Sequence, residues 1–259
     1  MLALITGATG GIGREYAYQL ARDYHCDLLL VSNEHTPTID LAQTMSEQYG
    51  VRALPYVADL SQSDAAEQLF SYTEQEQLVV DVLVNNAGIF IFNPLINTSM
   101  ARVETMLNLH VMTVTKLCRL YGEQMSRRGM GYILNMSSMS AWMAMPGIQL
   151  YNATKAFLYN FSKSLWYELK PYGVHVLAMA PGAVDTPLFG LSPRLRQLAV
   201  RLTVSIPPER LVRRALKKLF KGKKADTPGL LNWLATPLLK HPPDWLLFAV
   251  YRRIDKYQH

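Results

Sequence analysis

The chain of 259 residues is poor in the groups that build covalent cross-links and metal sites. It contains only two cysteines, Cys26 and Cys118, so neither a disulfide framework nor a thiolate metal cluster is expected. We interpret both as buried structural thiols. The six histidines show no metal-ligand spacing, so the sequence predicts no metal site.

Long apolar runs and an export signal are also missing. No stretch reaches about 18 uninterrupted apolar residues, so no membrane-spanning helix is predicted. The chain passes from Met1 into a first strand, which leaves no room for a signal peptide and favours a cytoplasmic location. Although the net charge is +6, no recognition motif accompanies it, and nucleic-acid binding is not expected.

Short apolar runs alternate with longer helical segments in the first two thirds of the chain. Runs nearly continuous in apolar residues are typical of parallel strands covered on both faces. Their alternation with helices predicts right-handed crossovers and a doubly wound α/β sheet of the Rossmann type. The expected strands are 1–6, 26–32, 51–57, 80–84, 132–136 and 174–180, and the expected helices include 13–23, 38–50, 61–75 (capped by Ser61) and 98–127.

We expect one domain spanning 1–259, because no linker or repeat interrupts the pattern. Residues 1–186 would form the cofactor-binding and catalytic part. From Thr186 onward prolines recur and break the periodicity, so 187–259 is interpreted as a substrate lid and a C-terminal tail. Within this part, residues 201–224 hold nine lysines and arginines against the single acidic Glu209.

A glycine-rich turn joins the first strand to the first helix. Its sequence is Thr6-Gly7-Ala8-Thr9-Gly10-Gly11-Ile12-Gly13. Glycines at this point let the backbone approach a pyrophosphate that binds the N-terminus of the helix. The turn therefore predicts a dinucleotide site.

Polar residues follow two later strands. Asp59 could accept a hydrogen bond from an adenine amino group or could cap the helix that starts near Ser61, and the two roles are compatible. Asn85-Asn86-Ala87-Gly88 ends the fourth strand, where Asn side chains can tie adjacent loops together and Gly88 can admit a cofactor closely.

Ser138, Tyr151 and Lys155 form the candidate catalytic group. Ser138 follows the fifth strand, and Tyr151 and Lys155 are one helical turn apart on one helix face. A phenol is a poor base at neutral pH, and a nearby ammonium favours the phenolate and lowers its pKa. Ser138 can then hold a substrate oxygen while Tyr151 delivers or removes the proton.

Together these ordered motifs, followed by Pro181-Gly182, resemble the short-chain dehydrogenase/reductase family over residues 1–186. The resemblance implies a sheet of about seven strands and a Ser-Tyr-Lys centre completed by Asn108, which holds a water linked to Lys155. It further implies that Lys155 binds the nicotinamide ribose, that Pro181, Gly182 and Thr186 contact the carboxamide, and that the helices containing Asn108 and Tyr151 mediate homo-oligomerisation.

The end of the second strand indicates the dinucleotide preference. NAD-dependent members usually place an aspartate where Ser32 stands, and NADP-dependent members usually place an arginine where Asn33 stands. Both determinants are missing. NADP(H) is favoured over NAD(H), because a 2′-phosphate tolerates Ser32 and Asn33 better than it tolerates a carboxylate, and Arg14 could assist.

The substrate is expected to be a hydrophobic ketone or secondary alcohol, either 3-oxoacyl-like or steroid-like. Met139 and the methionines and tryptophan after it, together with Leu188 in the lid, suggest an apolar pocket, although such clusters also occur in cores. Pro207-Pro208-Glu209, Lys221-Gly222-Lys223-Lys224 and Pro228-Gly229 resemble, more weakly, the reductases called DltE-like, which are related to 3-oxoacyl and steroid reductases.

The basic segment leaves three alternatives open. It could be a solvated helix face, a site for an acidic carrier or coenzyme A, or, with the apolar residues that follow it, a peripheral membrane element. The alternatives for the whole chain are an NAD(H)-dependent alcohol dehydrogenase of the same family and a non-catalytic dinucleotide sensor.

The sequence thus predicts an oxidoreductase with the following site residues. The catalytic set is Asn108, Ser138, Tyr151 and Lys155; the substrate set is Ser138, Met139, Tyr151 and Leu188; the cofactor set is Gly7, Thr9, Gly11, Ile12, Gly13, Ser32, Asn33, Asp59, Leu60, Asn86, Ala87, Gly88, Tyr151, Lys155, Pro181, Gly182, Val184 and Thr186.

Overall fold

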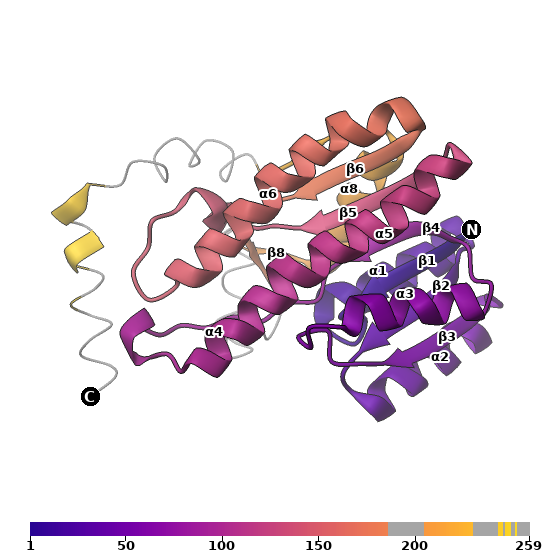
Figure 1. The fold of residues 1–259 in the computed structure, drawn as a ribbon, viewed down its shortest axis with the longest axis horizontal. Helices are drawn as coiled ribbons and strands as arrows, with labels where there is room; N and C mark the ends of the chain where they lie inside the picture. Colours follow the sequence, from indigo (N-terminus) through magenta and orange to yellow (C-terminus); the bar gives the residue numbers. More distant parts are fainter. Residues whose placement is uncertain (186–204, 230–242, 246, 250–251, 253–259) are drawn as a thin grey trace.

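The protein is described by a computed structural model covering residues 1–185, 205–229, 243–245, 247–249 and 252 (Figure 1). The proposed lid, with Thr186 and Leu188, and most of the apolar tail lie outside the described residues. Among the residues described, no helix is long and apolar enough to cross a membrane.

A seven-stranded parallel sheet forms the centre of the fold, in the order β3-β2-β1-β4-β5-β6-β9. The strands are β1 (Leu2–Thr6), β2 (Asp27–Ser32), β3 (Ala53–Val57), β4 (Val80–Asn85), β5 (Gly131–Met136), β6 (Val174–Met179) and β9 (Ala225–Asp226). The six strands predicted from apolar runs are confirmed. The seventh, β9, is only two residues long and has no such run. A separate parallel pair joins β7 (Ala183–Val184) to β8 (Ser205–Ile206).

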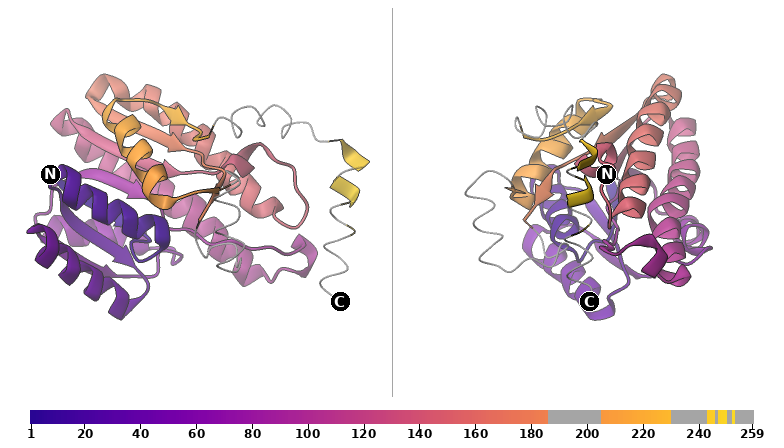
Figure 2. Two further views of the ribbon diagram at one scale, coloured as in Figure 1. Left: turned by 180° about the vertical axis from the view of Figure 1, so that it is seen from behind. Right: turned by 90° about the vertical axis from the view of Figure 1, so that its left-hand side faces the viewer.

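Helices cover both faces of the sheet. One face carries α1 (Gly11–Tyr24), α2 (His35–Tyr49) and α8 (Pro208–Phe220). This face is turned toward the viewer in the left view of Figure 2. The other carries α3 (Ala65–Gln75), α5 (Thr113–Arg128) and α6 (Gln149–Leu169), which lie in front in Figure 1. The doubly wound architecture is therefore confirmed.

The strand pattern explains why there are two apolar cores. Successive side chains of a strand point to opposite faces. In β1, Ala3 and Ile5 join the core under α1, α2 and α8, whereas Leu2 and Leu4 join the core under α3, α5 and α6. All four are buried, so both faces of the strand must be apolar. Cys26 and Cys118 are buried free thiols, one in each core, as expected.

Three of the predicted helices differ from those in the structure. The helix predicted as 38–50 begins three residues earlier, at His35. The segment predicted as 61–75 becomes helical only at Ala65, with Asp64 at the N-cap position, so Ser61 is not its cap. The segment predicted as 98–127 is divided into α4 (Met100–Leu107), a π-helical turn (Asn108–Met112) and α5. Within this turn the Thr113 N–H donates to the Asn108 carbonyl. Such an interruption leaves no mark in apolar periodicity.

The described part of the basic segment is amphipathic. The apolar side of α8 is buried against α1 and the sheet. Its cations lie on the outer side, where Arg213 pairs with Glu209 and Arg214 pairs with Asp226. This geometry favours a solvated helix face among the three alternatives.

Candidate functional site

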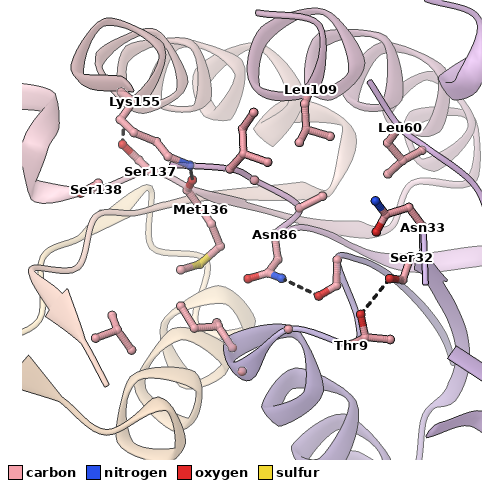
Figure 3. A pocket seen from close by; sticks show the side chains of 18 of the residues that line it. Thr9, Ser32, Asn33, Leu60, Asn86, Leu109, Met136, Ser137, Ser138 and Lys155 are labelled. Atoms are coloured by element: carbon pink, nitrogen blue, oxygen red, sulfur yellow. Dashed lines mark hydrogen bonds between the residues drawn. The ribbon is translucent and has the colours of Figure 1, made fainter. Parts of the chain in front are cut away.

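A cavity of about 590 Å³ opens at the carboxyl ends of the strands (Figure 3). This is the edge at which open α/β sheets bind ligands, and the volume suits a small-molecule site. Its lining includes these predicted residues: Gly7, Thr9, Gly11, Ile12, Ser32, Asn33, Asp59, Leu60, Asn86, Ala87, Gly88, Ser138, Tyr151, Lys155, Pro181, Gly182 and Val184.

Three predicted site residues lie in the described part of the chain but do not line this cavity. Gly13 lies in the first turn of α1, packed against the Gly7 carbonyl, and Met139 begins a 3-10 helix that packs against α6. Asn108 begins the π-helical turn and is half-buried. Thr186 and Leu188 lie outside the described residues. Within the described part, no cluster of three or more histidine, cysteine or acidic side chains could hold a metal.

The cavity also has lining residues that the sequence prediction did not include. They are Gly10, Glu34, Ala58, Ile89, Leu109, Met136 and Ser137. Each adjoins a residue in the predicted set or lies within two positions of one, so adjacency to a motif is the signal that could have found them.

Close backbone packing requires glycine at two positions of the turn. A Cβ on Gly13 would lie 2.0 Å from the Gly7 carbonyl oxygen, and Gly7 itself has φ of 64°. The Asn86 side chain donates to the Thr6 and Gly7 carbonyls, each at 3.1 Å, and so ties the two loops together as expected. The turn thereby presents the first N–H groups of α1 toward the cavity, which suits a pyrophosphate.

A hydroxyl and carboxylate cluster lies at the end of β2. The Thr9 hydroxyl is 2.8 Å from the Ser32 hydroxyl and donates to the Glu34 carboxylate at 2.5 Å. Asn33 is exposed beside them. Apart from Lys155 beside Tyr151, the described lining contains no lysine or arginine.

Asp59 closes a short turn before α3. Its carboxylate accepts from the Ser61 N–H at 2.9 Å, the Ser61 hydroxyl at 2.8 Å and the Gln62 side chain at 3.0 Å. These bonds, led by Gln62, lower the pKa of Asp59. Asp59 therefore caps this turn and not the helix, while its place in the cavity wall keeps the adenine contact as a prediction.

Tyr151 and Lys155 reach the cavity from the first turns of α6, and each is 6% exposed. The Lys155 Nζ donates to the Met136 carbonyl at 2.9 Å, and the Ser137 hydroxyl donates to the Lys155 carbonyl at 2.7 Å (Figure 3). The end of β5 thus holds the start of α6. Ser138, next along the chain, accepts from the Ser140 N–H at 3.1 Å.

Burial dominates the acid-base properties of this group. Burial raises the pKa of Tyr151 to about 12, and a hydrogen bond with Ser138 opposes the rise. Burial also lowers the pKa of Lys155 to about 8. The sequence predicts that Lys155 lowers the pKa of the phenol, but in the structure only the hydrogen bond with Ser138 opposes the effect of burial. Tyr151 is therefore a protonated phenol at neutral pH, which suits proton donation to a carbonyl oxygen.

Residues 1–194 match the family model described as short chain dehydrogenase. The chain belongs to the short-chain dehydrogenase family. Members of this family are oxidoreductases that act on CH–OH and C=O groups. Nothing in the described fold departs from that assignment, since the Rossmann-type sheet and the edge cavity are both present.

Three comparisons illustrate the similarity. The "Probable oxidoreductase EphD" of Mycobacterium tuberculosis is 33% identical over 186 residues, which cover 71% of this chain and 31% of that protein. The very-long-chain 3-oxoacyl-CoA reductase-A of Danio rerio is 33% identical over 270 residues, covering 99% and 78%. A short-chain dehydrogenase from Sphingobium yanoikuyae, solved in complex with NADPH, is 28% identical with a TM-score of 0.80, covering 91% and 92%. The chain thus spans about a third of the length of EphD.

Proposed function

We propose that this protein transfers hydride reversibly between NADP(H) and a hydrophobic ketone or secondary alcohol. One observation carries the proposal: a single cavity is bounded by the glycine turn and by Ser138, Tyr151 and Lys155. The first group suits a dinucleotide pyrophosphate, and the second suits proton exchange with a substrate oxygen. The dinucleotide, when bound, supplies or accepts the hydride.

In this proposal each catalytic side chain has a separate task. Ser138 holds the carbonyl oxygen by a hydrogen bond, and Tyr151, a protonated phenol, donates the proton to that oxygen. Lys155 binds the nicotinamide ribose and, with Asn108 in the π-helical turn, returns a proton to Tyr151. Pro181, Gly182 and Val184 also line the cavity, and a carboxamide would lie against them.

The preference for NADP(H) rests on the end of β2. Ser32 places a hydroxyl where an aspartate would repel a 2′-phosphate, and a relative of similar fold binds NADPH. The exposed Glu34 carboxylate opposes this preference, because it carries negative charge beside Ser32. Glu34 is therefore the residue to vary when the preference is tested.

The proposed substrate class is a 3-oxoacyl thioester. Ile89, Leu109 and Met136 give the cavity an apolar wall in addition to Tyr151 and Ser138. The zebrafish protein that this chain resembles over nearly its whole length is a very-long-chain 3-oxoacyl-CoA reductase. The apolar wall suits the acyl chain of such a substrate, and Ser138 and Tyr151 suit its carbonyl group.

A fluorescence titration of the purified protein with NADPH and NADH tests the proposal first. A panel of 3-oxoacyl-CoA esters of increasing chain length and a keto-steroid is then added to the same sample, and absorbance at the nicotinamide band is followed. Oxidation of NADPH by the acyl esters supports the proposal. Tight binding without turnover would instead indicate a dinucleotide sensor.

Three further expectations remain predictions. The chain would act in the cytoplasm. It would also form a homo-oligomer through the helical segments that contain Asn108 and Tyr151, and sedimentation of the purified protein tests this oligomeric state. Peripheral membrane contact through the tail is one of the alternatives for the basic segment, and under that alternative truncation at about Gly229 should abolish co-sedimentation with lipid vesicles.

A further inference from the structure

His110 is a buried residue to which the sequence analysis assigned no role. It lies in the π-helical turn and is only 1% exposed. Its Nε2 accepts a hydrogen bond from the Ile89 N–H at 3.0 Å, and its Nδ1 lies 2.9 Å from the Thr154 hydroxyl. The imidazole therefore bridges the loop after β4 and the catalytic helix α6.

The partners of His110 determine its tautomer. Because the Ile89 N–H can only donate, Nε2 must be the unprotonated nitrogen, and the proton must lie on Nδ1. Nδ1–H then donates to the Thr154 hydroxyl, which donates in turn to the Tyr151 carbonyl at 2.9 Å. A chain of hydrogen bonds with one direction thus runs from Ile89 through His110 and Thr154 to Tyr151.

Burial keeps this imidazole neutral. Desolvation, with the charge of Lys155 as a second cause, holds the pKa of His110 well below its usual value. A protonated ring would present N–H to the Ile89 N–H and would lose that bond. The neutral form is therefore the one that can complete the chain of hydrogen bonds.

The rings around His110 leave it little freedom. Its imidazole stands edge to face with the Tyr151 ring, with 5.9 Å between centroids and an angle of 71°. The Tyr151 ring is itself held by Phe90, at 5.1 Å and 80°. A Cβ on Gly88 would lie 3.0 Å from Nε2, so glycine permits the close approach. The π-helical turn adds a residue to the helix and changes the direction of the side chains that follow α4.

We propose that His110 is a positioning residue that fixes Tyr151 relative to the Gly88–Ile89 wall of the cavity. This inference rests on the proposed function, in which that wall borders the dinucleotide and Tyr151 delivers the proton. Both Gly88 and Ile89 line the cavity together with Tyr151. Displacements of about 1 Å between reacting groups can cost about a hundredfold in rate, so a rigid link between wall and acid has a direct effect on turnover.

Four single variants and one double variant test the link. His110→Phe keeps a ring beside Tyr151 but removes both hydrogen bonds, and Thr154→Val removes the hydroxyl at constant shape. Thr154→Ser restores the hydroxyl, and His175→Gln controls for loss of a histidine, because His175 lies on β6 outside the cavity lining. For each, kcat, KM and the thermal midpoint are measured.

His110→Phe and Thr154→Val should each lower kcat about tenfold with little change in KM for the ketone. The double variant, which combines His110→Phe with Thr154→Val, should have a kcat no lower than that of the less active single variant, because both substitutions break the same chain of hydrogen bonds. Thr154→Ser and His175→Gln should stay near the wild type. Folded variants with kcat within twofold of the wild type, or additive losses, would overturn the inference.

The tautomer of His110, measured from imidazole ¹⁵N shifts in the wild-type protein, needs no substrate. An Nδ1–H tautomer is expected, and an Nε2–H tautomer would overturn the proposed chain of bonds even in an active enzyme. An Nδ1–H tautomer in a protein that reduces none of the ketones would overturn the proposed function, and the positioning role with it.

Discussion

The Lys155 ammonium nitrogen lies 5.4 Å from the centroid of the Tyr151 ring, yet it donates its hydrogen bond to the Met136 carbonyl. The end of β5 therefore holds the lysine beside the phenol ring. In this arrangement the Tyr151 hydroxyl keeps its proton, because burial raises its pKa to about 12. The geometry suits an acid that donates to a carbonyl oxygen.

Tyr151→Phe should abolish turnover while cofactor binding is largely retained. The change removes the only proposed proton donor but keeps the ring that packs against Phe90. Loss of a general acid costs about a hundredfold or more in rate. Steady-state kinetics and an NADPH titration check both parts. Tyr159→Phe removes another phenol from the same helix and should be silent, and a Tyr151→Phe variant that still turned over would sink the catalytic assignment.

Lys155→Met should change how stability depends on pH. Burial lowers the pKa of Lys155 to about 8 in the folded chain, from 10.5. Between these values the unfolded chain binds more protons, so this group makes unfolding free energy rise with pH, by at most about 1.4 kcal/mol per pH unit. Below pH 8 the penalty for burying the ammonium is complete, and above 10.5 it is gone.

Denaturant titrations of wild type and Lys155→Met at pH 7.5, 8.5 and 9.5 measure this difference. Buried tyrosines act in the opposite direction, since their raised pKa values make stability fall above about pH 10, but they are common to both proteins and cancel in the comparison. The stability of the wild type relative to the variant should rise with pH. Parallel curves would show that Lys155 is not desolvated.

The sheet was predictable because burial on both faces leaves a simple pattern. Leu28, Leu29, Leu30 and Val31 are all fully buried, and such a run has few alternatives to a central parallel strand. The strand β9 was not predictable from pattern, because its two residues are only partly buried and pair with β6 through backbone groups. The π-helical turn at Asn108 was hidden for a similar reason: it is a backbone feature with no composition of its own.

The candidate site was likewise predictable from the sequence only in part. Residues at strand ends, such as Asn86 and Ser138, could be placed because parallel strands end at one edge of the sheet. Contacts between distant segments could not be placed. The bond between Thr9 and Glu34 and the bridge from Ile89 to Thr154 through His110 depend on how loops approach in space, which a single sequence does not encode in any local pattern.

Glu34→Gln should strengthen NADPH binding by about threefold to fivefold and leave NADH binding nearly unchanged. The substitution removes one negative charge beside Ser32, where a 2′-phosphate would lie, and an exposed charge has a modest, salt-dependent effect. Parallel titrations at low and high salt measure it. Glu47→Gln makes the same charge change on α2, away from Ser32, and should leave the affinity for both dinucleotides unchanged. Equal gains for NADH and NADPH would mean that Glu34 does not face the phosphate.

Gly13→Ala should destabilise the protein and abolish dinucleotide binding, whereas Gly10→Ala in the same turn should be tolerated. A Cβ at position 13 would lie 2.0 Å from the Gly7 carbonyl oxygen and 2.8 Å from the Asn86 Nδ2, so either α1 or the turn must move. Overpacking of this kind costs about 1–3 kcal/mol. At position 10 the nearest atom is 3.5 Å away and φ is −70°, which any residue adopts. Thermal unfolding and NADPH titration of both variants test this prediction. Equal thermal midpoints and equal NADPH affinities for the two variants would show that the contact between α1 and the turn does not hold the cavity in shape.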